Sequence, residues 1–156
     1  MNVGVFSSFA PFESTASDTV AGRLVGQLQK AGHETEHIRL PFSTRDAAAT
    51  TAAIVAVRLL TLIRLEVVIA LDFPAYCVRH PRKVVWMPLK QGPAPGAEVD
   101  PVMRNAEAAF LPEAAKLRAG SRGTVLALGR LGLSASLLRE PNTEAEWEDA
   151  ISELLG

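Results

Sequence analysis

Hydrophobic and polar positions in the first part of the chain follow two different spacings. Residues 2–7 form a short apolar run, whereas apolar residues from Val20 to Leu28 recur with helical spacing up to Gly32. The first spacing is typical of a strand and the second of an amphipathic helix. Ser17 is the predicted N-cap of this helix, and Gly32 is its predicted C-terminal end.

The alternation of strands and helices continues along the rest of the chain. Residues 67–71 are all apolar, which is typical of a strand buried on both faces. Strands are predicted over 33–40, 67–71, 83–87 and 136–138. Helices are predicted over 46–63, over 100–117 with a kink at Pro112, over 121–131, and from Thr143 to Leu155. Residues 73–79 are predicted to form a short turn or helix, and residues 88–96 a loop.

Strands that alternate with helices predict right-handed crossovers and a parallel sheet covered on both faces. We therefore expect an α/β fold, in which a single Rossmann-like domain has three layers, α/β/α, around a mostly parallel sheet. In such sheets ligands bind beyond the carboxyl ends of the strands, where the strand order reverses. With the first strand central, residues 7–17 and 88–98 would form the walls of that crevice.

Composition narrows the class of protein. The 156 residues fit one domain. With 16 basic against 17 acidic residues, no nucleic-acid partner is expected, because nucleic-acid binders usually carry a basic excess. Cys77 is the only cysteine, so no intrachain disulfide can form, as is usual in a reducing compartment.

Neither a secretory signal nor a membrane span is predicted. The N-terminal apolar run follows no basic segment, unlike a signal peptide. The apolar residues 54–71 include Arg58, Arg64 and Glu66, whose charges are costly inside a bilayer. We therefore expect a cytoplasmic protein without a transmembrane segment.

Candidate ligand-binding residues lie in the loop that follows the first strand. Residues 7–20 contain no glycine, so the dinucleotide-binding fingerprint is absent. A hydroxyl-rich loop before a helix N-terminus could instead bind sugar hydroxyls or a phosphate. In the structural alternative, the same hydroxyls only cap the helix. The candidates in this loop are Ser7, Ser8, Ser14 and Thr15.

Asp72 is a further candidate because it follows the buried strand 67–71, at the same predicted edge of the sheet. Its carboxylate could bind a ligand there, and capping of the following turn is the structural alternative. Weaker candidates in a later loop and at a later helix start are Lys90, Gln91, Ser121 and Arg122.

No metal site or nucleophilic dyad is predicted. His33 and His37 fall in a strand, and no third ligand lies near them in the sequence. Cys77 and His80 are three residues apart, but no carboxylate can be assigned to orient the histidine. The basic residues of 79–83 are expected on a solvated surface, with a contact to the acidic C-terminal segment as the alternative.

The segment 73–87 carries a more specific motif. It contains Phe-Pro-Ala-Tyr, then Arg-His-Pro, then basic residues and an apolar strand with Trp86 near its end. This motif resembles the N-terminal domain of family 4 glycosyltransferases, which have the two-domain GT-B architecture. The likeness extends over roughly residues 1–140, with weaker matches at Ala31–Glu34, Leu40–Phe42, Glu113–Ala114 and Ser121.

The resemblance implies a domain that binds a sugar or glycan acceptor, while a second domain holds the nucleotide-sugar donor and no metal is needed. The chain departs from the family in two loops, because the loop after Trp86 lacks a histidine and the first loop lacks paired glycines. After Pro141, where the donor domain should begin, the chain instead reaches Thr143–Leu155, which resembles the family's terminal helix. We therefore expect residues 1–141 to form a GT-B N-terminal-like Rossmann domain, and residues 142–156 to form an amphipathic helix that packs back on it.

Three functions remain open. The favoured one is the acceptor-binding half of a GT-B glycosyltransferase, inactive alone, which becomes a hexosyltransferase only with a donor-binding polypeptide. A nucleotide sugar would be bound only then, and no other cofactor is expected. The alternative is a non-catalytic binding or scaffold module that presents a sheet edge to a partner or forms a homodimer. The third, a complete one-domain enzyme of flavodoxin-like shape, lacks a cofactor fingerprint.

Overall fold

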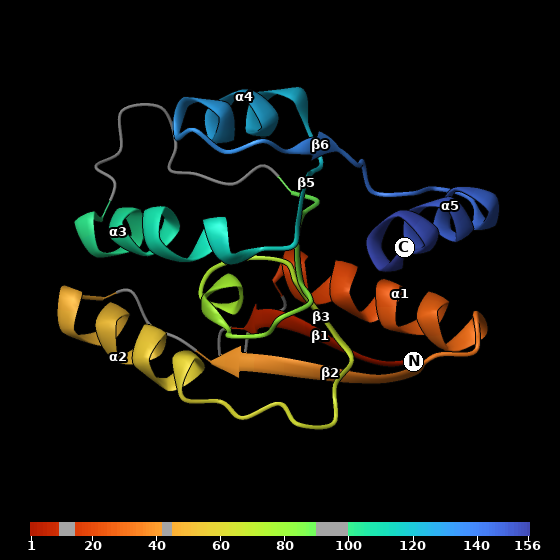
Figure 1. The fold of residues 1–156 in the computed structure, drawn as a ribbon, viewed down its shortest axis with the longest axis horizontal. Helices are drawn as coiled ribbons and strands as arrows, with labels where there is room; N and C mark the ends of the chain where they lie inside the picture. Colours follow the sequence, from red (N-terminus) through yellow and green to blue (C-terminus); the bar gives the residue numbers. More distant parts are fainter. Residues whose placement is uncertain (10–14, 42–44, 90–99) are drawn as a thin grey trace.

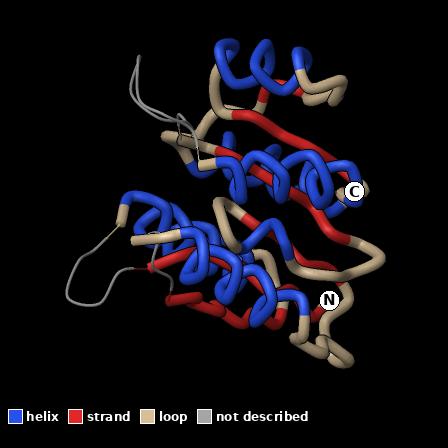
Figure 2. Tube along the Cα trace, turned by 90° about the vertical axis from the view of Figure 1, so that its left-hand side faces the viewer, coloured by secondary structure: helices blue, strands red, loops and turns tan. Residues whose placement is uncertain are grey.

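A parallel sheet forms the centre of the molecule. The computed structural model describes residues 1–9, 15–41, 45–89 and 100–156, and within them six strands pair in the order β2-β1-β3-β4-β5-β6 (Figure 1, Figure 2). All five pairings are parallel, which confirms the predicted α/β fold. The strands are β1 (Asn2–Phe9), β2 (Glu34–Pro41), β3 (Val67–Ala70), β4 (Lys83–Met87), β5 (Lys116–Ala119) and β6 (Ser136–Leu137).

Helices cover both faces of this sheet and complete the three layers. α1 (Ala16–Lys30) and α5 (Glu144–Leu155) pack on one face. The other face is covered by α2 (Ala47–Arg58), α3 (Pro101–Phe110) and α4 (Arg122–Arg130), together with the 3₁₀ turns η1 (Ala75–Cys77) and η2 (Leu111–Glu113) (Figure 1).

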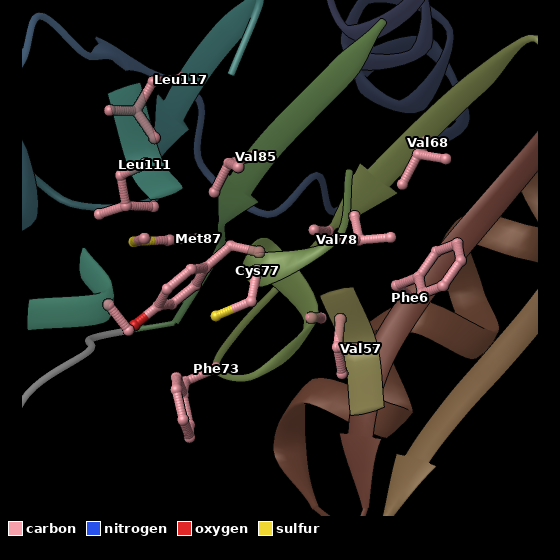
Figure 3. Close-up of a cluster of buried hydrophobic side chains, with 14 of the residues drawn as sticks. Phe6, Val57, Val68, Phe73, Cys77, Val78, Val85, Met87, Leu111 and Leu117 are labelled. Atoms are coloured by element: carbon pink, nitrogen blue, oxygen red, sulfur yellow. The ribbon is translucent and has the colours of Figure 1, made fainter. Parts of the chain in front are cut away.

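The side chains of the central strands alternate between two hydrophobic cores. Phe6 of β1 lies in the core under α2, α3 and α4, in the same cluster as Val68 of β3 and Val85 of β4 (Figure 3). Successive residues of a strand point to opposite faces. The residues that end the apolar part of β1, Ser7 and Ser8, therefore face opposite sides of the sheet.

One predicted helix is wrong. The chain does not remain helical from 100 to 117, because α3 ends at Phe110, η2 follows, and Ala114 is already extended. Pro112 has no backbone N–H to continue the helical hydrogen bonds. Leu117 lies instead in β5, opposite Val85 of β4, and the prediction missed this strand.

Two predicted helix ends also differ from the structure. The N-cap of α1 is Thr15 rather than Ser17, since the Thr15 Oγ1 accepts the Asp18 N–H at 3.1 Å. The predicted helix 46–63 ends at Arg58. The chain then turns so that Leu65 enters the core beside Gly4, where a Cβ would lie 2.5 Å from a Leu65 methyl.

The C-terminal helix α5 packs directly on the sheet. A capping box begins it, because the Thr143 Oγ1 accepts the Glu146 N–H and the Glu146 carboxylate accepts the Thr143 N–H. Trp147 packs edge-to-face on Trp86 of β4, with ring centroids 6.1 Å apart. An ion pair of 2.7 Å between Arg118 and Glu153 adds a contact to β5. Within the described residues, no helix has the length and apolar character needed to cross a membrane.

Candidate functional site

The strand order reverses between β1 and β3. From β1 the chain passes outward to β2, then returns past β1 to β3 and continues to β6 on the other side. The carboxyl ends of β1 and β3 therefore flank the topological switch point, which is where open α/β sheets bind ligands. Ser7 and Ser8 lie at the end of β1, and Asp72 lies just beyond β3. The structure thus brings these predicted residues to one edge.

Ser8 and Asp72 are bonded directly to each other across the switch point. The Ser8 N–H donates to Asp72 Oδ1 at 2.9 Å, and the Ser8 hydroxyl donates to Asp72 Oδ2. The Ser17 hydroxyl lies close enough to this carboxylate to lower its pKa. Both Ser8 and Asp72 are only 5% exposed. The backbone carbonyl of Asp72 also accepts the Tyr76 N–H, a bond of the following turn that does not involve the Asp72 side chain.

Burial raises the pKa of the Asp72 carboxyl, and hydrogen bonds from Ser8 and Ser17 oppose that rise. The negative charge of Asp18 raises it a little further. A carboxyl of this kind can accept a proton or a hydrogen bond from a hydroxyl group. Because the Asp72 side chain is buried, a ligand hydroxyl would reach these oxygens only where neighbouring side chains move aside.

The Thr15 hydroxyl bonds to backbone groups of both β1 and α1. Its Oγ1 accepts the Asp18 N–H and donates to the Ser8 carbonyl at 3.2 Å. The helix-capping alternative therefore holds for Thr15. This bond also fixes the N-terminus of α1 beside the end of β1, where the positive end of the helix dipole favours an electron-rich ligand group.

Ser7 belongs to a second polar cluster, which sequence analysis missed. It is fully buried, and its Oγ lies 2.9 Å from His37 Nε2 and 3.5 Å from Asp18 Oδ1. Arg39 binds Asp18 through two hydrogen bonds of 2.7 and 2.9 Å. The available signal was that His37 and Arg39 are two apart in β2 and so share a face.

The chemistry of this second cluster is limited. Burial lowers the pKa of His37, and the neighbouring Asp18 carboxylate opposes that fall. His37 meets Ser7 and Asp18 through the same nitrogen, whereas a catalytic triad uses the two ring nitrogens separately. Among the described residues, His, Cys, Asp and Glu side chains form no group suited to holding a metal ion.

The remaining predicted residues are not part of the Ser8–Asp72 contact. Ser121 caps α4, because its Oγ accepts the Thr124 N–H at 3.1 Å, and Arg122 begins that helix. Both follow β5, and β4 separates that strand from β3. Two strand spacings amount to about 10 Å. Ser14, Lys90 and Gln91 lie outside the described residues.

Lys83 does not lie on the predicted solvated surface. Its side chain is fully buried, and its Nζ donates to the carbonyls of Tyr76 at 2.9 Å and Phe110 at 2.8 Å. Glu113 completes the contact at 3.4 Å and also pairs with Arg58 at 2.7 Å. This group joins η1 to the end of α3. The alternative was a contact of this basic cluster with the acidic C-terminal segment. Arg82 does reach that segment, but it donates to the backbone carbonyl of Leu155 at 3.4 Å rather than to an acidic side chain.

Cys77 is unsuited to nucleophilic catalysis. The residue is fully buried in η1, and this burial raises the pKa of its thiol to about 12. The reactive thiolate is therefore scarce at neutral pH.

No protein-family model matches this chain, and comparison with curated proteins found no match either.

Proposed function

We propose that this chain is a glycosyltransferase-related module that binds a sugar or glycan acceptor at the β1/β3 switch point. In this proposal it has no transfer activity alone, and a separate donor-binding polypeptide supplies the nucleotide sugar. The observation that carries the proposal is the hydroxyl and carboxyl cluster of Ser8, Ser17 and Asp72 at the N-terminus of α1. Neutral hydroxyls and a carboxyl are groups that can exchange hydrogen bonds with sugar hydroxyls.

The family-like motif begins at Phe73, directly after Asp72 in the sequence. Its Tyr76 and Trp86 are 2% and 0% exposed, so they hold the edge of the sheet in place rather than touch a ligand. The Tyr76 N–H bonds the Asp72 carbonyl, and the Tyr76 carbonyl accepts from Lys83. The motif therefore has a physical reason to accompany an acceptor site formed by Asp72.

Geometry supports the proposed inactivity of the module alone. Group transfer requires donor and acceptor to be aligned in one site. Between β6 and α5 the chain has only residues 138–143, which leave no room for a donor-binding domain at that point. One edge of one sheet supplies a single wall of such a cleft, and in the proposal the second wall comes from another polypeptide segment.

A non-catalytic binding or scaffold module remains the second candidate. One observation favours it: the polar side-chain groups of Ser8, Thr15 and Asp72 bond to one another or to the backbone. A ligand would have to compete with these bonds. Binding of any sugar is therefore the property that separates the two functions.

The test is an NMR titration of the isotope-labelled chain with a panel of mono- and disaccharides. We expect amide shifts to concentrate at residues 7–9, 15–18 and 71–76, and Asp72→Asn to weaken them. Asp149→Asn, an exposed aspartate of α5, is the matched control and should bind as the parent does. Absence of shifts with every sugar would favour the scaffold function.

A second assay tests the division of labour. Transfer to a bound sugar is measured with the chain alone, with a donor-binding GT-B domain alone, and with both. We expect activity only in the mixture. Tight binding of uridine or guanosine diphosphate sugars by the chain alone would contradict the proposal.

A further inference from the structure

The outer face of α2 is apolar and open to solvent. Its exposed positions form two neighbouring rows along the helix, and together they line a shallow groove. Val55 and Leu59 are 50% and 75% exposed. Residues 47–57 contain no charged side chain. A contiguous apolar face of this kind commonly marks an interaction site in a soluble protein.

We propose that this face pairs with the same face of a second copy of the chain, with the two α2 helices antiparallel. The two rows differ in size, and this difference makes the face self-complementary. The small row is Ala48, Ala52 and Ala56, and the larger row is Thr51, Val55 and Leu59.

A two-fold axis near residues 53 and 54 brings each row against the other. Leu59 then opposes Ala48 of the partner's α2, and Val55 opposes Ala52 of that helix. The side chains of one row thus enter the space that the alanines of the other leave, which is how helix ridges and grooves pack. The two-fold symmetry is the usual one for a dimer of identical chains.

Electrostatics favour an uncharged partner surface, and the same face of a second copy supplies one. A charged partner surface would lose its hydration against this face and gain no ion pair or hydrogen bond in return. The face therefore favours an uncharged partner surface. Antiparallel packing also sets the positive end of each helix dipole near the negative end of the other. The exposed apolar residue Leu126 of α4, by contrast, shares its helix with Arg122 and Arg130, which would repel each other in a self-pair.

The small area of this face predicts a weak dimer. Twelve helical residues span about 18 Å, and a face of that length falls short of the roughly 800 Å² per partner of a standard interface. We therefore expect a weak dimer with a dissociation constant of roughly 0.1–1 mM. This inference does not depend on sugar binding, and no sugar is present in its test.

Sedimentation velocity of the full chain over a range from about 20 μM to about 1 mM brackets that constant. We expect the sedimentation coefficient to rise with concentration. Val55→Glu brings two carboxylates together near the axis and should raise the dissociation constant at least about tenfold. Leu126→Glu, at a leucine of α4 that is 65% exposed, should leave it unchanged. Ala52→Glu serves as a second variant if Val55→Glu fails to fold.

Cross-linking tests the geometry. A mixture of Ala48→Cys and Leu59→Cys chains, treated with a short bismaleimide, should give mainly the mixed dimer, which intact mass identifies. The buried Cys77 should not react in the parent chain. A monomer at every concentration, association that Val55→Glu leaves intact, or dominant linkage of Ala48→Cys to itself would each overturn the proposal.

Discussion

The Asp72 carboxylate accepts both the backbone N–H and the hydroxyl of Ser8, 64 residues away in the sequence. These bonds connect the ends of β1 and β3 at the point where the strand order reverses. The side chains of Ser8 and Asp72 are buried, and these bonds take the place of the hydrogen bonds that both would otherwise make with water. The contact therefore contributes to stability and also shapes the candidate site.

Ser8→Ala tests the energetic weight of this contact. The substitution leaves the backbone hydrogen bond in place and removes the hydroxyl donor from a buried carboxylate. We expect the free energy of unfolding to fall by about 1–2 kcal/mol, measured by urea denaturation. Ser136→Ala, at an exposed serine of β6, is the matched control and should change little. Equal effects of the two variants would contradict the assigned role of Ser8.

The raised pKa of Asp72 predicts a specific pH dependence of stability. The unfolded carboxyl ionises near its ordinary value of 3.8, whereas the folded carboxyl ionises at a higher pH. Between these two values the native state binds more protons, so the stability contributed by this group declines as pH rises through the folded pKa. Asp72→Asn should remove this decline, and melting temperatures of both proteins across pH 4–7 measure it. Parallel curves for parent and variant would contradict the prediction.

Lys83 supplies a third prediction. Lys83→Met retains the length of the side chain but leaves two buried carbonyls without their donor. We expect a loss of about 3 kcal/mol in the free energy of unfolding. Lys30→Met removes an exposed lysine whose partner is Glu144 and should have little effect, because surface ion pairs contribute little. A small effect of Lys83→Met would show that water replaces its ammonium group.

Gly120 and Gly26 form a matched pair of glycine substitutions. A Cβ at Gly120 would lie 2.1 Å from the Pro88 carbonyl oxygen, so Gly120→Ala forces the ends of β4 and β5 apart. We expect a loss of at least about 2 kcal/mol in thermal or urea unfolding. At Gly26, inside α1, a Cβ meets no atom within 4 Å. Gly26→Ala should instead stabilise the protein by about 0.5–1 kcal/mol. Similar effects of the two variants would contradict the close approach at Gly120.

Several predicted elements are confirmed, among them the two-residue strand β6, whereas β5 and the end of α3 were missed. The apolar run 67–71 and the stripe of α1 each repeat often enough to identify an element. β5 has only Leu117 and Ala119 buried, and it follows a helical stretch, so its alternation was too short to recognise. The end of α3 could not be placed from the sequence, because it depends on the backbone hydrogen bonds that β4 offers to the residues beyond Pro112.

The candidate site was predictable only in part. The position of Ser8 and Asp72 followed from the rule that ligands bind at the carboxyl ends of parallel strands. Their direct contact did not follow, because it depends on β3 pairing with β1. The roles of His37 and Lys83 were missed because a polar residue carries no sequence signal of its burial. Only the surrounding elements make it a buried group with a shifted pKa.

The sequence by itself determined the local features: the alternation of elements and the helix caps at Asp46, Ser121 and Thr143. Each depends on hydrogen bonds or apolar spacing within a few residues. Only the tertiary structure decided which loops meet. The order of strands in the sheet sets those neighbours, and it results from packing both faces of the sheet against helices from distant parts of the chain. The contact of Ser8 with Asp72 and the solvent-exposed face of α2 are both products of that packing.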